Sequence, residues 1–249
     1  KVSMKKIKER IYLAGLIIIG NEILSGRTED KNIAYIANSL SKSGIRLNEV
    51  RVIADIEEEI ILAINNFRDR FDYVFTTGGI GPTHDDITTQ SIAKAFGVEN
   101  VLNQDAYKIL LDYYGDRKKI NESRMRMAYA PEGSELIYNN ISKAPGFKKE
   151  NVFILAGVPK IMRSMFDAIL PTLKKGRILN SIEINAKVPE GVIAPELTKI
   201  QEKYHEIEIG SYPYYENDSA GTILVLRSIN KEALKNGEIE VLNLIKRFT

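Results

Sequence analysis

The hydrophobic pattern of the first 175 residues alternates between short apolar runs and segments whose apolar residues recur at helical spacing. The first run, Tyr12–Gly20, is almost entirely apolar and shows no period of two, which is typical of a strand buried on both faces of a parallel sheet. Further along, Ile60, Ile64 and Phe67 form one apolar stripe of a predicted helix at Glu57–Arg70. Because strands and helices alternate, the pattern predicts an open, three-layer α/β fold with a mostly parallel sheet. The other predicted strands are Glu49–Asp55, Asp72–Gly79 and Asn151–Pro159, and the other predicted helices are a segment through Ile33, Ile36, Ala37 and Leu40 that stops at Gly44, then Ile87–Phe96, Gln104–Tyr114 and Lys160–Leu173.

The pattern changes after Lys175, where two lysines and a glycine follow the last of these helices. Residues 1–175 are therefore expected to form one domain and residues 176–249 a second, smaller α+β domain. The predicted elements of the second domain are a strand at Ile178–Val188, a helix at Pro195–Tyr204, a hairpin of Ile207–Tyr215 with Thr222–Ile229, and a helix at Lys231–Arg247.

Composition excludes several classes of function. The 249-residue chain has a net charge of +2, so its totals point neither to nucleic acid nor to an anionic membrane as a partner. The chain has no cysteine and only two histidines, His84 and His205, which excludes disulfides, thiol catalysis and multi-histidine metal sites. Lys5, Lys6 and Lys8 precede the apolar run as in a signal peptide, but no small-residue cleavage site follows. The run is also too short to span a bilayer, so we expect a soluble, cytoplasmic protein.

Glycine-rich stretches follow three of the predicted strands: GNEILSG at Gly20–Gly26, TTGGIGPTHDD at Thr76–Asp86 and LAGVP at Leu155–Pro159. In parallel α/β sheets, ligands bind outside the carboxyl ends of the strands, where all three stretches are expected to lie. Within the second stretch, three glycines let the backbone approach a ligand and direct N–H groups at a phosphate. The stretch is neither a Walker loop, since no Gly-Lys-Ser/Thr follows, nor a dinucleotide fingerprint, since His84 occupies the place of the last glycine.

Acidic residues accompany these glycines. Asp85 and Asp86 stand side by side before a predicted helix, and an N-cap role accounts for only one of them. Two carboxylates beside a phosphate site indicate a divalent cation shared between the protein and phosphate oxygens. Glu22 lies between two glycines at the same expected edge, although an exposed turn glutamate is the plainer alternative. Asp55 ends a strand at that edge, where it could also cap the next helix.

Taken together, these motifs resemble a known family. GNEILSG, Asp30-Lys31-Asn32, Asp55, TTGGIGPTHDD, the KAPGF at Lys143–Phe147 and LAGVP resemble the molybdopterin-binding domain of the MoaB/Mog type, and more closely its version in the CinA (competence/damage-inducible) family. The resemblance covers nearly the whole chain, because the SYPYY of the second domain matches the small middle domain of that family. Full-length members continue into a nicotinamide-nucleotide amidase domain, so that activity is expected to be absent here. Relatives of this domain are dimers or trimers, which implies a homo-oligomer.

The resemblance implies a small-molecule nucleotide substrate in the strand-end cleft. In the CinA branch, the implied activity is hydrolysis of the diphosphate of ADP-ribose or a related dinucleotide such as FAD, with Mg²⁺, Mn²⁺ or Co²⁺ as the metal. Adenylyl transfer to molybdopterin and non-catalytic nucleotide binding remain open as alternatives. The sequence departs from the molybdopterin enzymes and resembles the CinA branch at two places: it has Ile80, and it has Asp85 beside Asp86. Two further residues, Ala156 and Ser142, depart from the usual motifs.

The motifs and the resemblance together give a set of predicted site residues. Asp86 and Asp55 match the functional aspartates of the molybdopterin enzymes and are the predicted catalytic residues. Asp85, Asp86 and Glu22 are the predicted metal ligands. The predicted substrate-binding residues are Gly20, Asn21, Glu22, Ser25, Gly26, Thr77, Gly78, Gly79, Gly81, Pro82, Thr83, Gly157 and Pro159.

Overall fold

The computed structural model of the protein describes residues 10–216 and 219–248, so the basic residues Lys5, Lys6 and Lys8 lie outside the described residues. The chain divides between Gly176 and Arg177 into two compact units. Within the described residues, no helix is both long and apolar enough to cross a membrane.

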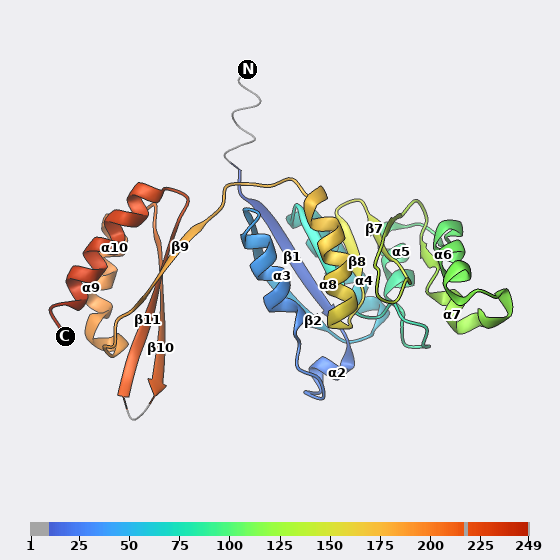
Figure 1. Cartoon of the computed structure of the whole chain (residues 1–249), viewed down its shortest axis with the longest axis horizontal. Coiled ribbons are helices and arrows are strands. Elements are labelled where there is room, and N and C mark those ends of the chain that lie inside the picture. Colours follow the sequence, from blue (N-terminus) through green and yellow to red (C-terminus); the bar gives the residue numbers. More distant parts are fainter. Residues whose placement is uncertain (1–9, 217–218, 249) are drawn as a thin grey trace, which may run out of the picture. The chain divides into compact units, whose positions relative to one another are not determined.

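The first unit is built on a six-stranded sheet of order β2-β1-β3-β8-β7-β6 (Figure 1). Four neighbouring strands, β2, β1, β3 and β8, pair in parallel, whereas β7 and β6 extend the sheet by antiparallel pairing. The predicted mostly parallel sheet is therefore confirmed for the strands that carry the glycine-rich stretches. The strands are β1 (Tyr12–Ile19), β2 (Ile45–Ile53), β3 (Tyr73–Thr77), β6 (Glu135–Ile137), β7 (Gly146–Lys149) and β8 (Val152–Leu155).

Helices cover both faces of this sheet and make the fold three-layered. Ile17 and Ile19 of β1 belong to a core cluster with the buried sides of α4 (Glu57–Arg70), α5 (Thr88–Phe96) and α6 (Gln104–Tyr114). Leu16 and Ile18, which alternate with them, belong to the cluster with α3 (Asn32–Ser41) and α8 (Pro159–Ile169). Burial on both faces explains why the first apolar run lacks a period of two.

The structure differs from the predicted elements at several boundaries. β2 begins at Ile45 rather than Glu49 because it pairs with β1 from Tyr12 onward, and pairing extends a strand whose own pattern is weak. Helix α8 gives way at Leu170 to a 3₁₀ turn, η2 (Leu170–Thr172), where Pro171 cannot donate a helical hydrogen bond. The remaining short elements are too brief to show a period: α2 (Asn21–Leu24), β4 (Asn100–Leu102), η1 (Arg117–Lys119), α7 (Glu122–Arg126) and β5 (Tyr129–Pro131).

The second unit is an α+β domain of its own. Its antiparallel sheet has the order β10-β11-β9, and α9 and α10 pack on it through one apolar core. Helix α9 begins at Glu190, not at Pro195. The additional first turn contains Ile193, whose complete burial in the core stabilises that turn. The hairpin is also tighter than predicted, since Glu216 pairs with Ser219. The elements are β9 (Asn180–Asn185), α9 (Glu190–Lys203), β10 (Glu208–Glu216), β11 (Ser219–Ser228) and α10 (Lys231–Ile245).

Candidate functional site

The three glycine-rich bends touch one another through their backbones. Gly78 has φ of 103°, and a Cβ there would lie 2.0 Å from the carbonyl oxygen of Ile19, at the end of β1. A Cβ on Gly157, after β8, would lie 3.2 Å from the Cα of Gly78. The Gly78 N–H donates to the Leu155 carbonyl at 3.1 Å. Only glycine permits this approach, so the carboxyl ends of β1, β3 and β8 meet at one place.

The middle bend is anchored to the start of helix α5. Gly79 has φ of 65°, and its carbonyl accepts a hydrogen bond of 2.9 Å from the Thr88 N–H. The buried Thr88 hydroxyl donates to the Gly78 carbonyl at 3.0 Å. These bonds fix the bend rigidly against the helix and leave the following residues, Ile80 and Gly81, at a cavity.

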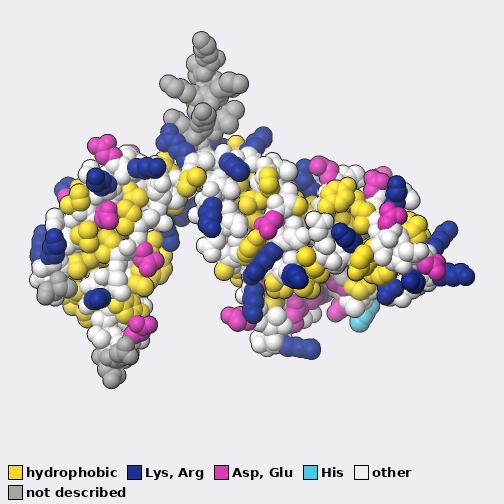
Figure 2. Space-filling model, in the orientation of Figure 1, with side chains coloured by type: hydrophobic (Ala, Val, Ile, Leu, Met, Phe, Trp, Pro, Cys, Tyr) yellow, Lys and Arg dark blue, Asp and Glu magenta, His cyan; other side chains and the backbone are white. Residues whose placement is uncertain are grey.

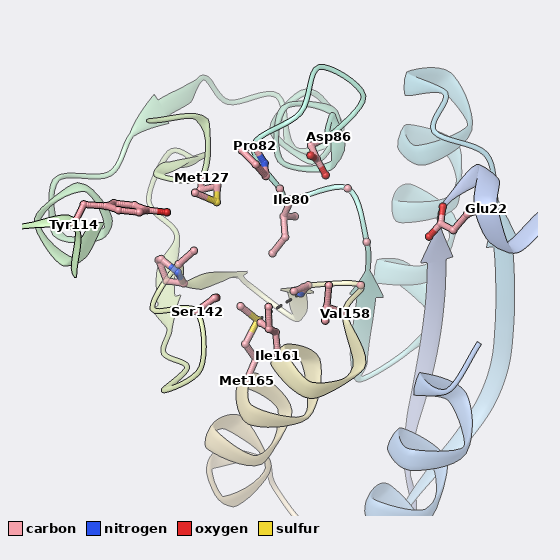
Figure 3. Close-up of a pocket in the computed structure, with 17 residues that line it drawn as sticks. Glu22, Ile80, Pro82, Asp86, Tyr114, Met127, Ser142, Val158, Ile161 and Met165 are labelled. Atoms are coloured by element: carbon pink, nitrogen blue, oxygen red, sulfur yellow. Dashed lines mark hydrogen bonds between the residues drawn. The ribbon is translucent and has the colours of Figure 1, made fainter. Parts of the chain in front are cut away.

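This cavity has a volume of about 370 Å³ and is surrounded by the bends and by an apolar wall (Figure 3). Glu22 and Asp86 lie toward one side of it, and the side chains of Met127, Tyr114 and Met165 lie toward the other. The Ala156 N–H donates to the Met165 sulfur at 3.4 Å, the contact drawn as a dashed line. The apolar wall comprises Ile80, Pro82, Tyr114, Met127, Ala144, Pro145, Ala156, Val158, Ile161 and Met165.

The carboxylates of Glu22 and Asp86 each pack closely against a glycine. A Cβ on Gly20 would lie 2.5 Å from Oε2 of Glu22, and a Cβ on Gly81 would lie 2.6 Å from Oδ2 of Asp86. Oδ2 of Asp86 also accepts hydrogen bonds from the Thr83 N–H at 2.8 Å and from the Thr83 hydroxyl at 2.5 Å. The glycines thus make room for the carboxylates, and the turn holds Asp86 in one orientation.

The other two predicted aspartates lie outside this cavity. Asp85 is exposed and does not line the cavity. Oδ2 of Asp55 accepts a hydrogen bond of 2.9 Å from the Asn21 N–H, so this carboxylate ties the end of β2 to the first bend. Asp55 is therefore placed to position Glu22 rather than to touch a ligand in the cavity.

Seven predicted site residues line the cavity: Glu22, Gly78, Gly79, Gly81, Pro82, Asp86 and Gly157. Gly20, Asn21, Ser25, Gly26, Asp55, Thr77, Thr83, Asp85 and Pro159 do not. Thr77 is buried in β3 and Pro159 begins α8, whereas Thr83 donates hydrogen bonds to the Asp86 carboxylate. In the orientation of Figure 2, acidic side chains gather at the lower edge of the first unit, near the carboxyl ends of its strands.

Of the apolar wall, the sequence prediction included only Pro82. The KAPGF and LAGVP motifs contain Ala144, Pro145, Ala156 and Val158, so those positions carried a signal. No local signal marks Tyr114 or Met127, because each is brought to the cavity only by the packing of its segment.

The side chains that could bind a metal ion at the cavity determine which kind of metal site is possible. The described residues contain no group of three or more histidine, cysteine or acidic side chains that could hold a metal ion. Two carboxylates, Glu22 and Asp86, line the cavity. Mg²⁺ typically binds through one or two carboxylates plus substrate phosphates and keeps several waters. The residues present therefore fit a divalent cation that is shared with a phosphate ligand.

Comparison with known proteins gives two family matches and close relatives. The family described as "Probable molybdopterin binding domain" matches residues 15–175, and the one described as "FAD synthase, middle domain" matches residues 179–247. The crystal structure of CinA from Thermoplasma acidophilum is similar at 34% identity and a TM-score of 0.61, covering 65% of this chain and 97% of that one. A protein of Archaeoglobus fulgidus is 33% identical over 80% of this chain and 84% of its own length. A protein of Sulfurisphaera tokodaii is 37% identical over 82% and 81%, respectively.

Proposed function

Because this chain belongs to the family of molybdopterin-binding domains, joined here to a region that matches the middle domain of FAD synthase, we propose that it is a metal-dependent nucleotide pyrophosphohydrolase. Its substrate is ADP-ribose or a related dinucleotide such as FAD. One observation carries the proposal: three glycine bends, two carboxylates and an apolar wall surround a single cavity.

Each part of the cavity suits one part of a nucleotide. A flat heterocycle packs well against the apolar wall, which includes Met127, Ile161 and Met165. The bends at Gly79 and Gly81 bring the backbone to the cavity, where N–H groups can receive a phosphate. Two negative carboxylates beside an anionic ligand repel it unless a cation lies between them, which favours a metal-dependent reaction over simple anion binding.

The reaction is attack by water on one phosphorus of the diphosphate. The new P–O bond forms as the bridging P–O bond breaks, the electrons of that bond leave with the second phosphate, and two monophosphates result. A divalent cation, if held by Asp86, would neutralise the charge that develops on the phosphate oxygens. Asp86, held by Thr83, contributes to the cation site in a fixed orientation. The Glu22 carboxylate accepts no hydrogen bond from any residue that the structure describes, so it is available to take the proton of the attacking water.

The test is a panel of ADP-ribose, FAD and related dinucleotides with Mg²⁺, Mn²⁺, Co²⁺ or EDTA, with products separated by chromatography. We expect each substrate that is cleaved to yield two monophosphates, and only when a metal is present. If no dinucleotide yields product with any of the three metals, the hydrolase proposal is wrong. Turnover of ATP with molybdopterin, and none of ADP-ribose, would support adenylyl transfer, the second candidate, whose substrate is the ligand named in the family description "Probable molybdopterin binding domain".

Replacing Glu22 by glutamine should lower kcat about a hundredfold, because the amide cannot accept the proton of the attacking water. Thermal unfolding should be unchanged, since Glu22 is exposed. Glu29→Gln is the matched control: it removes an exposed charge a few residues away that does not line the cavity, and should leave kcat within about twofold. Equal activities of the two variants would remove Glu22 from the mechanism.

A further inference from the structure

A second cavity, of about 570 Å³, lies against the turn that carries Asp86. Asp86 lines both cavities. The other walls of the second cavity come from the start of α5, from β4 and β5, and from Arg126 at the end of α7. Its character differs from that of the first cavity, because most of its lining is polar and includes His84, Gln90, Asn100, Arg126 and Tyr129.

Arg126 gives this cavity a positive charge close to Asp86. Its Nη1 donates to the Thr83 carbonyl at 3.3 Å, and Thr83 is the residue that holds the Asp86 carboxylate. Within residues 10–216 and 219–248, Arg126 forms no ion pair. A guanidinium without an acidic partner is well suited to bind a phosphate through two parallel hydrogen bonds.

Other groups around Arg126 suit a hydroxyl-rich ligand. Gln90 and Tyr129 bring an amide and a phenol to the wall of the cavity. Asn100 also lines this cavity and adds a second amide side chain to its polar wall.

We propose that the second cavity binds the sugar phosphate half of a dinucleotide whose nucleoside half occupies the first cavity. This inference rests on the proposed function, which it makes more specific. A dinucleotide has two unlike halves joined by a short diphosphate, and the structure has two unlike cavities joined at Asp86. The apolar wall receives the base, Asp86 lies at the diphosphate, and Arg126 contacts the phosphate next to the sugar.

Calorimetry with Mg²⁺ present tests this arrangement, with two probes: AMP, and an ADP-ribose analogue that cannot be cleaved because a methylene group replaces its bridging oxygen. Arg126→Gln should weaken ADP-ribose binding about tenfold or more, because a charge-assisted hydrogen-bond pair is lost. The affinity for AMP, which fits the first cavity alone, should change less than about twofold. Arg117→Gln is the matched control, since Arg117 is an exposed arginine of the same unit that lines neither cavity. In the hydrolysis assay with Mg²⁺, Arg126→Gln should raise KM for ADP-ribose by the same factor.

A second variant tests the same arrangement if the Arg126→Gln protein does not fold. Gln90→Glu adds a negative charge to the second cavity at an exposed position of α5, and should also weaken ADP-ribose binding while sparing AMP. The inference is overturned if both variants bind ADP-ribose like the wild type, or if AMP binding falls equally. In those cases hydrolysis by the wild type would leave the proposed function standing. A wild type that neither binds nor cleaves ADP-ribose or FAD would remove both proposals.

Discussion

Asp86→Asn should lower the turnover of ADP-ribose about a thousandfold, the largest loss that we expect from a single side chain. Asparagine has nearly the same shape and can still accept the hydrogen bonds from Thr83, so the turn should keep its conformation. What it removes is the negative charge at the residue shared by both cavities. The measurement is kcat with Mg²⁺, together with a thermal unfolding curve that should match the wild type.

The neighbouring aspartate provides the control for this prediction. Asp85→Asn changes the same charge one residue away, but Asp85 is exposed and lies outside both cavities. Its activity should stay within about threefold of the wild type. If the two variants lose activity equally, the adjacent carboxylates act as a pair, and the assignment of the cation site to Asp86 without Asp85 is wrong. Full activity of Asp86→Asn would contradict the hydrolase mechanism itself.

Gly79→Ala should destabilise the first unit by about 2–4 kcal/mol and also impair catalysis. Two costs add at this position. The backbone has φ of 65°, which disfavours any side chain, and the new Cβ would lie 2.1 Å from Oγ1 of Thr88. Thr88 is fully buried and donates to the Gly78 carbonyl, so it cannot move aside without releasing the bend. A displacement of about 1 Å in the bend is enough to reduce turnover about a hundredfold.

Gly97→Ala is the control that measures the cost of the backbone conformation without a steric contact. Gly97 has φ of 66°, but a Cβ there would meet nothing within 4 Å. Its substitution should therefore cost only the backbone term, about 1 kcal/mol, and leave kcat unchanged. Urea unfolding of both variants measures the difference. If Gly79→Ala costs no more than Gly97→Ala, the contact with Thr88 is not a constraint and the bend is more adaptable than the structure indicates.

Much of the first unit could be predicted from the chain alone. The boundaries of α4 and α6 are as predicted, because each helix carries an apolar stripe, and Asn103 and Gly115 also delimit α6. The order of strands and helices similarly fixed the parallel sheet and placed the three glycine-rich bends at one edge. Of the four acidic residues predicted at that edge, Glu22 and Asp86 line the cavity, whereas Asp55 and Asp85 do not.

The sequence could not decide which of these acids face a ligand. Asp85 and Asp86 are adjacent in the chain and identical in chemistry, yet only Asp86 points to a cavity, because Thr83 hydrogen-bonds it into that orientation. Asp55 follows β2 at the same edge, yet it does not line the cavity, and its Oδ2 accepts a hydrogen bond from the Asn21 N–H. Side-chain direction in a turn depends on hydrogen bonds between segments, and no local pattern encodes them.

The sequence by itself therefore determined the fold class, the division into two unlike units and the edge of the sheet at which the glycine-rich motifs gather. These features follow from the hydrophobic period and the strand order. Only the tertiary structure decided the composition of the cavities. Tyr114, Met127 and Arg126 come from short or irregular segments whose position is set by packing on distant residues. The physical reason is that a period reports which face of an element is buried, whereas a cavity is formed by the faces of several elements meeting in space.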